Sequence, residues 1–165
     1  MVLKRRWKIV IVATILAATI ILASLLYFFW WDTTGSDGVI PTAMFSKTPV
    51  SGGWQINIVS ITNTVIPWDD IRVQLNDGTD FVEWSIKTAD LDGGFNITAH
   101  YAAKSLSTLS VTLTVTDVGG NGFANGGDYL TFTAAPVFSS ATVYATMLIY
   151  EPFGEQMGNG ITFSS

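Results

Sequence analysis

The chain has 165 residues, no cysteine, one histidine and a formal net charge of −5 at pH 7. The lack of cysteine excludes disulfides, a thiol nucleophile and thiolate metal sites. All 13 acidic residues follow residue 31, together with only four of the eight Lys and Arg. A part this acidic disfavours nucleic acid as a partner.

Residues 1–8 are basic, and residues 9–31 form one long apolar segment. Between residues 9 and 29 there is no charge, proline or glycine. At about 1.5 Å per residue, a helix of this length spans roughly 30 Å, the thickness of a bilayer core. A cleavable signal has a shorter apolar core followed by small residues, whereas this segment ends in Tyr27 to Trp31. The pattern predicts a retained transmembrane helix over 9–31, with residues 1–8 cytoplasmic and the rest at the cell surface.

Small residues recur four apart within the apolar segment. Ala13 and Ala17 form one such pair, and Ala18 and Ala23 belong to two others. This spacing lets helices approach closely in lipid, so these four alanines are candidate helix–helix contacts in a homo-oligomer. A lone anchor is the alternative.

The pattern changes to a period of two beyond the anchor. Residues 32–51 are rich in Thr, Ser, Gly and Pro and read as a connector. Apolar and polar residues then alternate over 54–58, 71–75, 82–86, 109–116, 130–132, 142–150 and 161–163, with Gly, Asp, Asn or Pro turn signals between them. Alternation of this kind is typical of antiparallel sheets with one buried face. The sequence predicts an all-β, immunoglobulin-like sandwich over 52–165, following the N-terminal helix.

Few residues point to catalysis. His100 is the only histidine, and the acidic pairs Asp69–Asp70, Asp77 with Asp80, and Asp90 with Asp92 lie in turn-like stretches. Asp favours turns because its carboxylate accepts hydrogen bonds from nearby backbone N–H groups. No nucleophile–base pair can be named, so we expect no enzymatic activity.

Residues 117–128 resemble a calcium loop in part. Such loops place oxygen donors at positions 1, 3, 5, 7 and 12 and a glycine at position 6. Asp117, Asn121, Gly122 and Asp128 fall at positions 1, 5, 6 and 12, and Phe123 can offer its carbonyl from position 7. Position 3 is a glycine. A weak Ca²⁺ site and a metal-free glycine-rich hairpin loop are both consistent with this pattern.

One N-glycosylation triplet, Asn96-Ile97-Thr98, lies on the predicted outer side. Glycosylation of Asn96 would show that this part of the chain lies outside the cell.

The layout as a whole resembles archaeal type IV pilin-like and archaellin-like proteins. A basic start, one apolar helix and a Thr/Ser/Gly-rich, cysteine-free β domain carry the resemblance, together with residues 65–78 and 115–129. It implies a structural subunit of an extracellular filament, with the helix first as anchor and then as filament core. The alternative is a membrane-anchored adhesion or binding module for a glycan or surface-layer partner.

Overall fold

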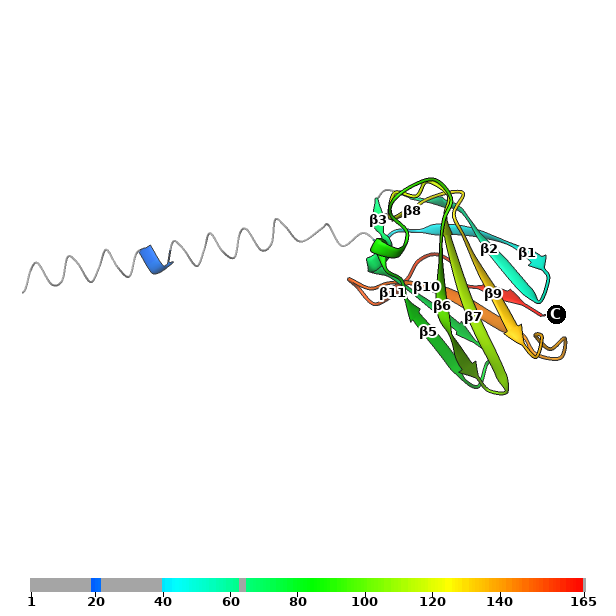
Figure 1. Cartoon of the computed structure of the whole chain (residues 1–165). Coiled ribbons are helices and arrows are strands. Elements are labelled where there is room, and N and C mark those ends of the chain that lie inside the picture. The colour runs from blue at the N-terminus through cyan, green and yellow to red at the C-terminus, as the bar shows by residue number, and fades with distance from the viewer. Residues whose placement is uncertain (1–18, 22–39, 63–64, 165) are drawn as a thin grey trace, which may run out of the picture. The chain divides into compact units, whose positions relative to one another are not determined.

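A computed structural model describes residues 19–21, 40–62 and 65–164 (Figure 1). By its contacts the chain divides into two compact units, Met1–Val39 and Ile40–Ser165. Within the first unit only residues 19–21 are described, and they are helical.

The predicted fold class, a long N-terminal apolar helix followed by an immunoglobulin-like sandwich, was wrong. The described residues are mainly strands, and none of their helices is long and apolar enough to cross a membrane. The structure therefore does not support the description of a pilin-like, type IV pilus or adhesion protein with a transmembrane helix. The remainder of 9–31, with Ala13, Ala17, Ala18 and Ala23, lies outside the described residues.

The second unit is a sandwich of two antiparallel sheets. Sheet I has the order β1 (Ala43–Val50), β2 (Gly53–Ile61), β9 (Tyr129–Ala135), β7 (Leu109–Asp117) and β6 (Ile97–Leu106). Sheet II has the order β11 (Glu155–Gln156), β10 (Tyr144–Tyr150), β4 (Ile71–Asn76) and β5 (Phe81–Ser85), and β12 (Ile161–Phe163) also pairs with β10. A small two-stranded ladder joins β3 (Ile66–Pro67) to β8 (Phe123–Ala124). Two short 3₁₀ helices complete the fold: η1 (Trp68–Asp70) follows β3, and η2 (Thr88–Asp90) follows β5.

Strand β7 shows why the alternating segments form strands. Val111, Leu113 and Val115 are fully buried between the sheets, while Thr112 and Thr114 lie on the opposite face and are half-buried. Because side chains alternate between the two faces, a one-residue slip would expose every buried side chain of the strand. The pattern therefore fixes both the strand and its register.

Aromatic side chains fill one half of the core. The ring of Phe163 lies 5.6 Å from Trp54, 5.4 Å from Phe138 and 5.9 Å from Tyr144, centroid to centroid. Phe132 joins the same cluster, 6.3 Å from Phe163. Truncating a buried aromatic of this kind typically costs about 3–5 kcal/mol, so the cluster is a main source of stability.

The first strand, β1, lies inside the segment 32–51 that the sequence assigned to a connector. Its central residues Ser46 to Pro49 are exposed, because β1 is an edge strand paired only with β2. Edge strands bury little and need no strict alternation, and Lys and Pro are typical of them. This is why the pattern in the sequence did not reveal it.

Candidate functional site

The loop after β7 is built around a buried carboxylate, Asp117. Its Oδ1 accepts a hydrogen bond from the Gly120 N–H at 2.6 Å. Its Oδ2 accepts one from the Gly122 N–H at 3.0 Å and one from the Trp68 indole N–H at 3.3 Å. Asp117 is fully buried. A buried carboxylate is tolerated only when donors replace its water, and three donors do so in this loop.

Asp128 closes the other end of the same loop. Its Oδ1 accepts from the Val118 N–H at 2.9 Å, and its Oδ2 accepts from the Asn125 N–H at 2.6 Å. Burial raises the pKa of Asp128 to about 6; the two backbone hydrogen bonds act against this rise, and the nearby charge of Asp117 adds to it. The two carboxylates therefore hold the ends of the loop together at the cost of mutual repulsion.

The loop path requires a glycine at position 120. Its φ is +58°, and a Cβ there would lie 1.1 Å from the carbonyl oxygen of Gly94. Any side chain at this position would collide with the backbone of the neighbouring loop. Gly120 thus lets the 117–128 loop pack against the segment that leads into β6.

The predicted calcium donors Asp117, Asn121, Phe123 and Asp128 do lie in one loop. However, Asn121 Oδ1 accepts from the Phe123 N–H at 3.0 Å, and the Phe123 carbonyl accepts from Asn125 Nδ2 at 2.7 Å. All four donors therefore already accept hydrogen bonds from N–H groups of the protein. Within residues 19–21, 40–62 and 65–164, no three acidic or histidine side chains group as a metal site. Calcium binding stays a prediction, and it would have to compete with these hydrogen bonds.

Two aromatic side chains, Trp68 and Tyr150, are poorly accessible to a ligand. Trp68 is fully buried, with its indole bonded to Asp117. Tyr150 is half-buried against Phe153, 5.6 Å between ring centroids. No alternating pattern surrounds Trp68, so its burial could not be read from its neighbours.

The remaining sequence candidates form no hydrogen bond with this loop's two carboxylates, although the Asn96 N–H donates to the Val118 carbonyl at 3.2 Å. Asn96 lies just before β6 with φ of +55°. Its side chain is exposed, so its amide is accessible for glycosylation. His100 lies on the outer side of β6, and its Nδ1 lies 3.1 Å from the Thr114 hydroxyl. Asp77 has the predicted turn role: Oδ1 accepts from the N–H groups of Thr79 at 2.9 Å and Asp80 at 2.8 Å. These hydrogen bonds, led by the one from Asp80, lower the pKa of Asp77.

A second candidate site is the outer face of sheet I, which we name the neutral face. The strand registers place uncharged polar side chains side by side across all five strands. Its members are Ser46, Thr48, Gln55, Asn57, Thr98, His100, Ser105, Ser110, Thr112, Thr114, Thr116, Tyr129, Thr131 and Thr133. Not one of these residues is Asp, Glu, Lys or Arg, whereas residues 40–165 carry eleven acidic and four basic side chains.

Hydrogen bonds between strands organise the neutral face. The hydroxyls of Thr98 and Thr116 lie 3.0 Å apart, and those of Thr112 and Thr133 lie 3.3 Å apart. A hydroxyl has one donor and two acceptor positions, so each pair uses one donor and keeps one. Thr116 is buried, whereas exposed Thr98 and half-buried Thr112 and Thr133 can still hydrogen-bond to a neighbour.

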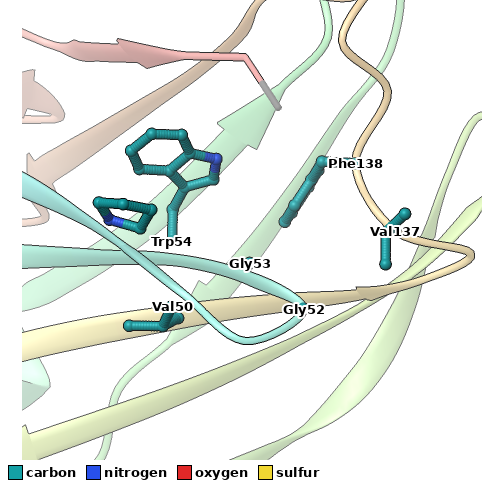
Figure 2. A pocket seen from close by; sticks show the side chains of 7 residues that line it. Val50, Gly52, Gly53, Trp54, Val137 and Phe138 are labelled. Atoms are coloured by element: carbon teal, nitrogen blue, oxygen red, sulfur yellow. The ribbon is translucent and has the colours of Figure 1, made fainter.

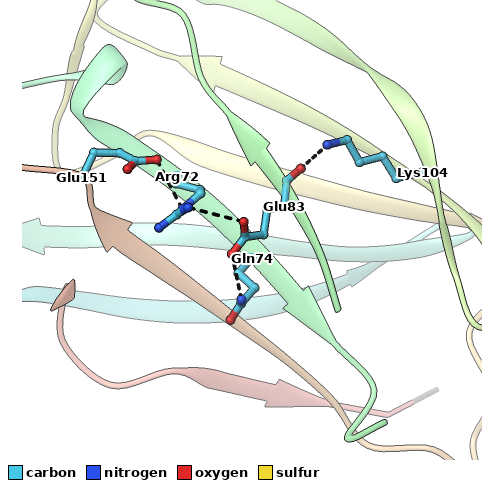
Figure 3. Close-up of polar contacts among 5 residues, drawn as sticks. All are labelled: Arg72, Gln74, Glu83, Lys104 and Glu151. Atoms are coloured by element: carbon cyan, nitrogen blue, oxygen red, sulfur yellow. Dashed lines mark hydrogen bonds and ion pairs between the residues drawn. The ribbon is translucent and has the colours of Figure 1, made fainter. Parts of the chain in front are cut away.

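Two lysines close the open sides of the sandwich in the same way. On β1, Lys47 Nζ donates to the Thr162 carbonyl at 2.6 Å and lies 5.6 Å from the centre of the Trp54 ring. On β6, Lys104 Nζ donates to the Glu83 carbonyl (Figure 3). The same nitrogen lies 5.9 Å from the centre of the Trp84 ring. Both lysines occupy edge strands of sheet I and reach across to sheet II. Lysine on an edge strand opposes the pairing of that edge with another chain.

Sheet II carries charge on its outer face instead. The Arg72 guanidinium lies between two carboxylates, with Nε 3.2 Å from Glu151 Oε1 and Nη1 3.4 Å from Glu83 Oε2 (Figure 3). Gln74 Nε2 also donates to Glu83 Oε1 at 2.9 Å. Partly exposed pairs like these contribute at most about 1 kcal/mol each. They distinguish this face from the uncharged one on the other side.

An open groove of about 270 Å³ lies beside the β1–β2 turn (Figure 2). The residues that line it are Pro49, Val50, Gly52, Gly53, Trp54, Val137 and Phe138. Val137 is exposed, and Phe138 is buried at the groove's inner side. A groove this small and open can hold one ring of a ligand rather than enclose a whole one. This groove could not be predicted from the sequence, because 137–138 and 49–54 meet only in the folded chain.

No family model matches this chain, and no curated protein matches it.

Proposed function

We propose that the chain is a non-catalytic structural subunit whose β-sandwich assembles with copies of itself outside the cell, in a filament or a layer. The observation that carries this proposal is how the sandwich uses its chemically capable side chains. Asp117, Asp128, Lys47 and Lys104 all bind backbone or indole groups that tie loops and sheet edges together. Groups committed in this way serve rigidity, which a repeated building block needs.

The surface composition supports the same proposal. Outward-facing strand positions carry Thr, Ser, Asn and Gln rather than charged residues over a whole sheet. Charged residues are depleted at the centres of protein interfaces, and long charged side chains lose more entropy when they are immobilised. A face built from short neutral side chains therefore costs less to bury against another molecule.

Sedimentation velocity and electron microscopy of the purified full-length chain test this function. We expect species larger than a monomer that grow with protein concentration, and regular particles in the micrographs. A single monomeric species across the whole concentration range would contradict the proposal.

A second candidate function, a binding module for a glycan or a surface partner, is favoured by the groove at Trp54. Aromatic rings bind sugar faces, and Val137 lies exposed at the edge of this groove. Glycan-array binding that is lost in Val137→Asp but kept in Val143→Asp would support it. Val143 is a matched control because it is equally exposed, at 63% against 65%, and does not line the groove.

A further inference from the structure

We infer that the neutral face of sheet I is the surface through which one copy of this chain contacts a second copy, centred on Thr114 and Thr131. This inference rests on the proposed structural function and names the contact that the assembly would use. Thr131 lies on β9, the middle strand of sheet I, and Thr114 lies directly opposite it on β7.

The charge distribution favours a second copy as the occupant. Residues 40–165 carry eleven acidic side chains against four basic ones, so two copies repel each other at most orientations. The neutral face contributes no formal charge to that repulsion. Two copies that meet face to face also keep their acidic loops and turns, such as those at Asp77 and Asp117, outside the contact.

The edges of sheet I are protected against the other common route of β-sheet assembly. Lys47 on β1 and Lys104 on β6 each cross the open side of the sandwich to a carbonyl of sheet II. Pro49 removes a backbone donor from β1, and the β6–β7 pairing shifts register between Tyr101 and Lys104. Prolines, edge lysines and bulges all block strand addition, so assembly through the edges of sheet I is disfavoured while its outer face stays open to contact.

The size of the neutral face sets the strength of the contact. Five strands about 4.8 Å apart and about 20 Å long give a face of roughly 500 Å². This is less than the about 800 Å² that each partner buries in a stable pair of proteins. We therefore expect two isolated copies to bind each other weakly. The overall affinity rises when each copy contacts several neighbours at once.

Cysteine cross-linking on the full-length chain tests the inference, because the natural sequence has no cysteine. Thr114→Cys places one thiol at the centre of the face, and Thr162→Cys places one on β12 of sheet II as the control, where the exposed thiol is more accessible than at half-buried Thr114. With a short bis-maleimide we expect Thr114→Cys to give covalent dimers at least tenfold faster than Thr162→Cys. Adding Thr131→Glu to Thr114→Cys should abolish the dimers, whereas Thr131→Ser should keep them. Melting curves of each variant establish that it is folded.

The salt dependence of cross-linking is an independent test of the same contact. Raising NaCl from roughly 0.01 M to roughly 1 M shortens the Debye length from about 30 Å to about 3 Å and screens the repulsion between acidic copies. The Thr114→Cys cross-linking rate should therefore rise with salt, and a fall would show that charged groups make the contact.

The outcomes separate this inference from the proposed function. Equal cross-linking of Thr114→Cys and Thr162→Cys, or none at Thr114 in a chain that still assembles, overturns the neutral face and leaves the structural function in place. A wild-type chain that never assembles contradicts the proposed function. Selective dimers of Thr114→Cys in that case would still establish the face as a pairwise contact.

Discussion

Replacement of Asp117 by alanine is the sharpest test of how the loop at 117–128 is held. The change removes the only carboxylate that accepts from Gly120, Gly122 and the Trp68 indole. The two glycines and Trp68 are themselves buried, so water cannot readily take the place of the lost acceptor.

The magnitude follows from counting these donors. An unsatisfied buried donor costs about 1–3 kcal/mol, so three give roughly 3–9 kcal/mol. The variant also no longer buries the charged carboxylate of Asp117, and the desolvation free energy saved offsets part of this loss. We expect a net decrease of about 3–5 kcal/mol in the free energy of unfolding, against a total of about 5–15 kcal/mol for a domain. For a domain of this size the melting temperature should fall by roughly 10–20 °C.

Urea unfolding of the full-length chain, followed by tryptophan fluorescence, measures this difference. Asp90→Ala is the control, because Asp90 is exposed on η2 and should change stability by less than about 0.5 kcal/mol. A Trp68→Phe and Asp117→Asn double-mutant cycle isolates the indole–carboxylate bond, for which we expect a coupling of about 1–2 kcal/mol. A loss below about 1 kcal/mol for Asp117→Ala would refute the reasoning.

Three further predictions concern pH, calcium and the sheet edges. Because burial raises the pKa of Asp128 to about 6, above its unfolded value near 3.9, the folded chain takes up a proton first. The unfolding free energy in EDTA should therefore rise as the pH falls from 7 through 6 and level off near 4, and Asp128→Asn should flatten this rise. Because the loop donors already accept hydrogen bonds, we expect millimolar Ca²⁺ or its removal by EDTA to leave the melting temperature unchanged. A calcium-dependent increase that Asp128→Asn abolishes would instead establish the metal site. Lys47→Val combined with Lys104→Val should increase thioflavin-positive aggregation, since both sheet edges lose their protecting charge. Unchanged aggregation would show that other features protect those edges.

Several local features could be predicted from the sequence because they depend on neighbouring residues. Alternation over 71–75, 82–86 and 109–116 predicted strands, and β4, β5 and β7 lie there. The turn role of Asp77 was also predictable, since its carboxylate bonds to backbone groups two and three residues further on. The calcium-like spacing of residues 117–128 identified a real loop, although its carboxylates bind N–H groups of the protein.

The predicted N-terminal helix over 9–31 is a different case, because most of that segment lies outside the described residues. An apolar run of this length predicts a membrane span, but among the residues that the structure describes no helix can cross a membrane. Strand β1 shows a different limit, since an exposed edge strand carries no alternating pattern.

The sequence by itself determined strands with one buried face, such as β4, β5 and β7, and several of the turns, because a period of two and turn residues act over a few positions. Only the tertiary structure decided which distant groups meet. The indole of Trp68 bonds to Asp117 across 49 residues of chain, and Lys47 reaches Thr162 across 115. The neutral face likewise exists only once five strands from residues 43 to 135 lie side by side. The order of strands in a sheet depends on how the whole core packs, so it cannot be predicted from a local sequence pattern.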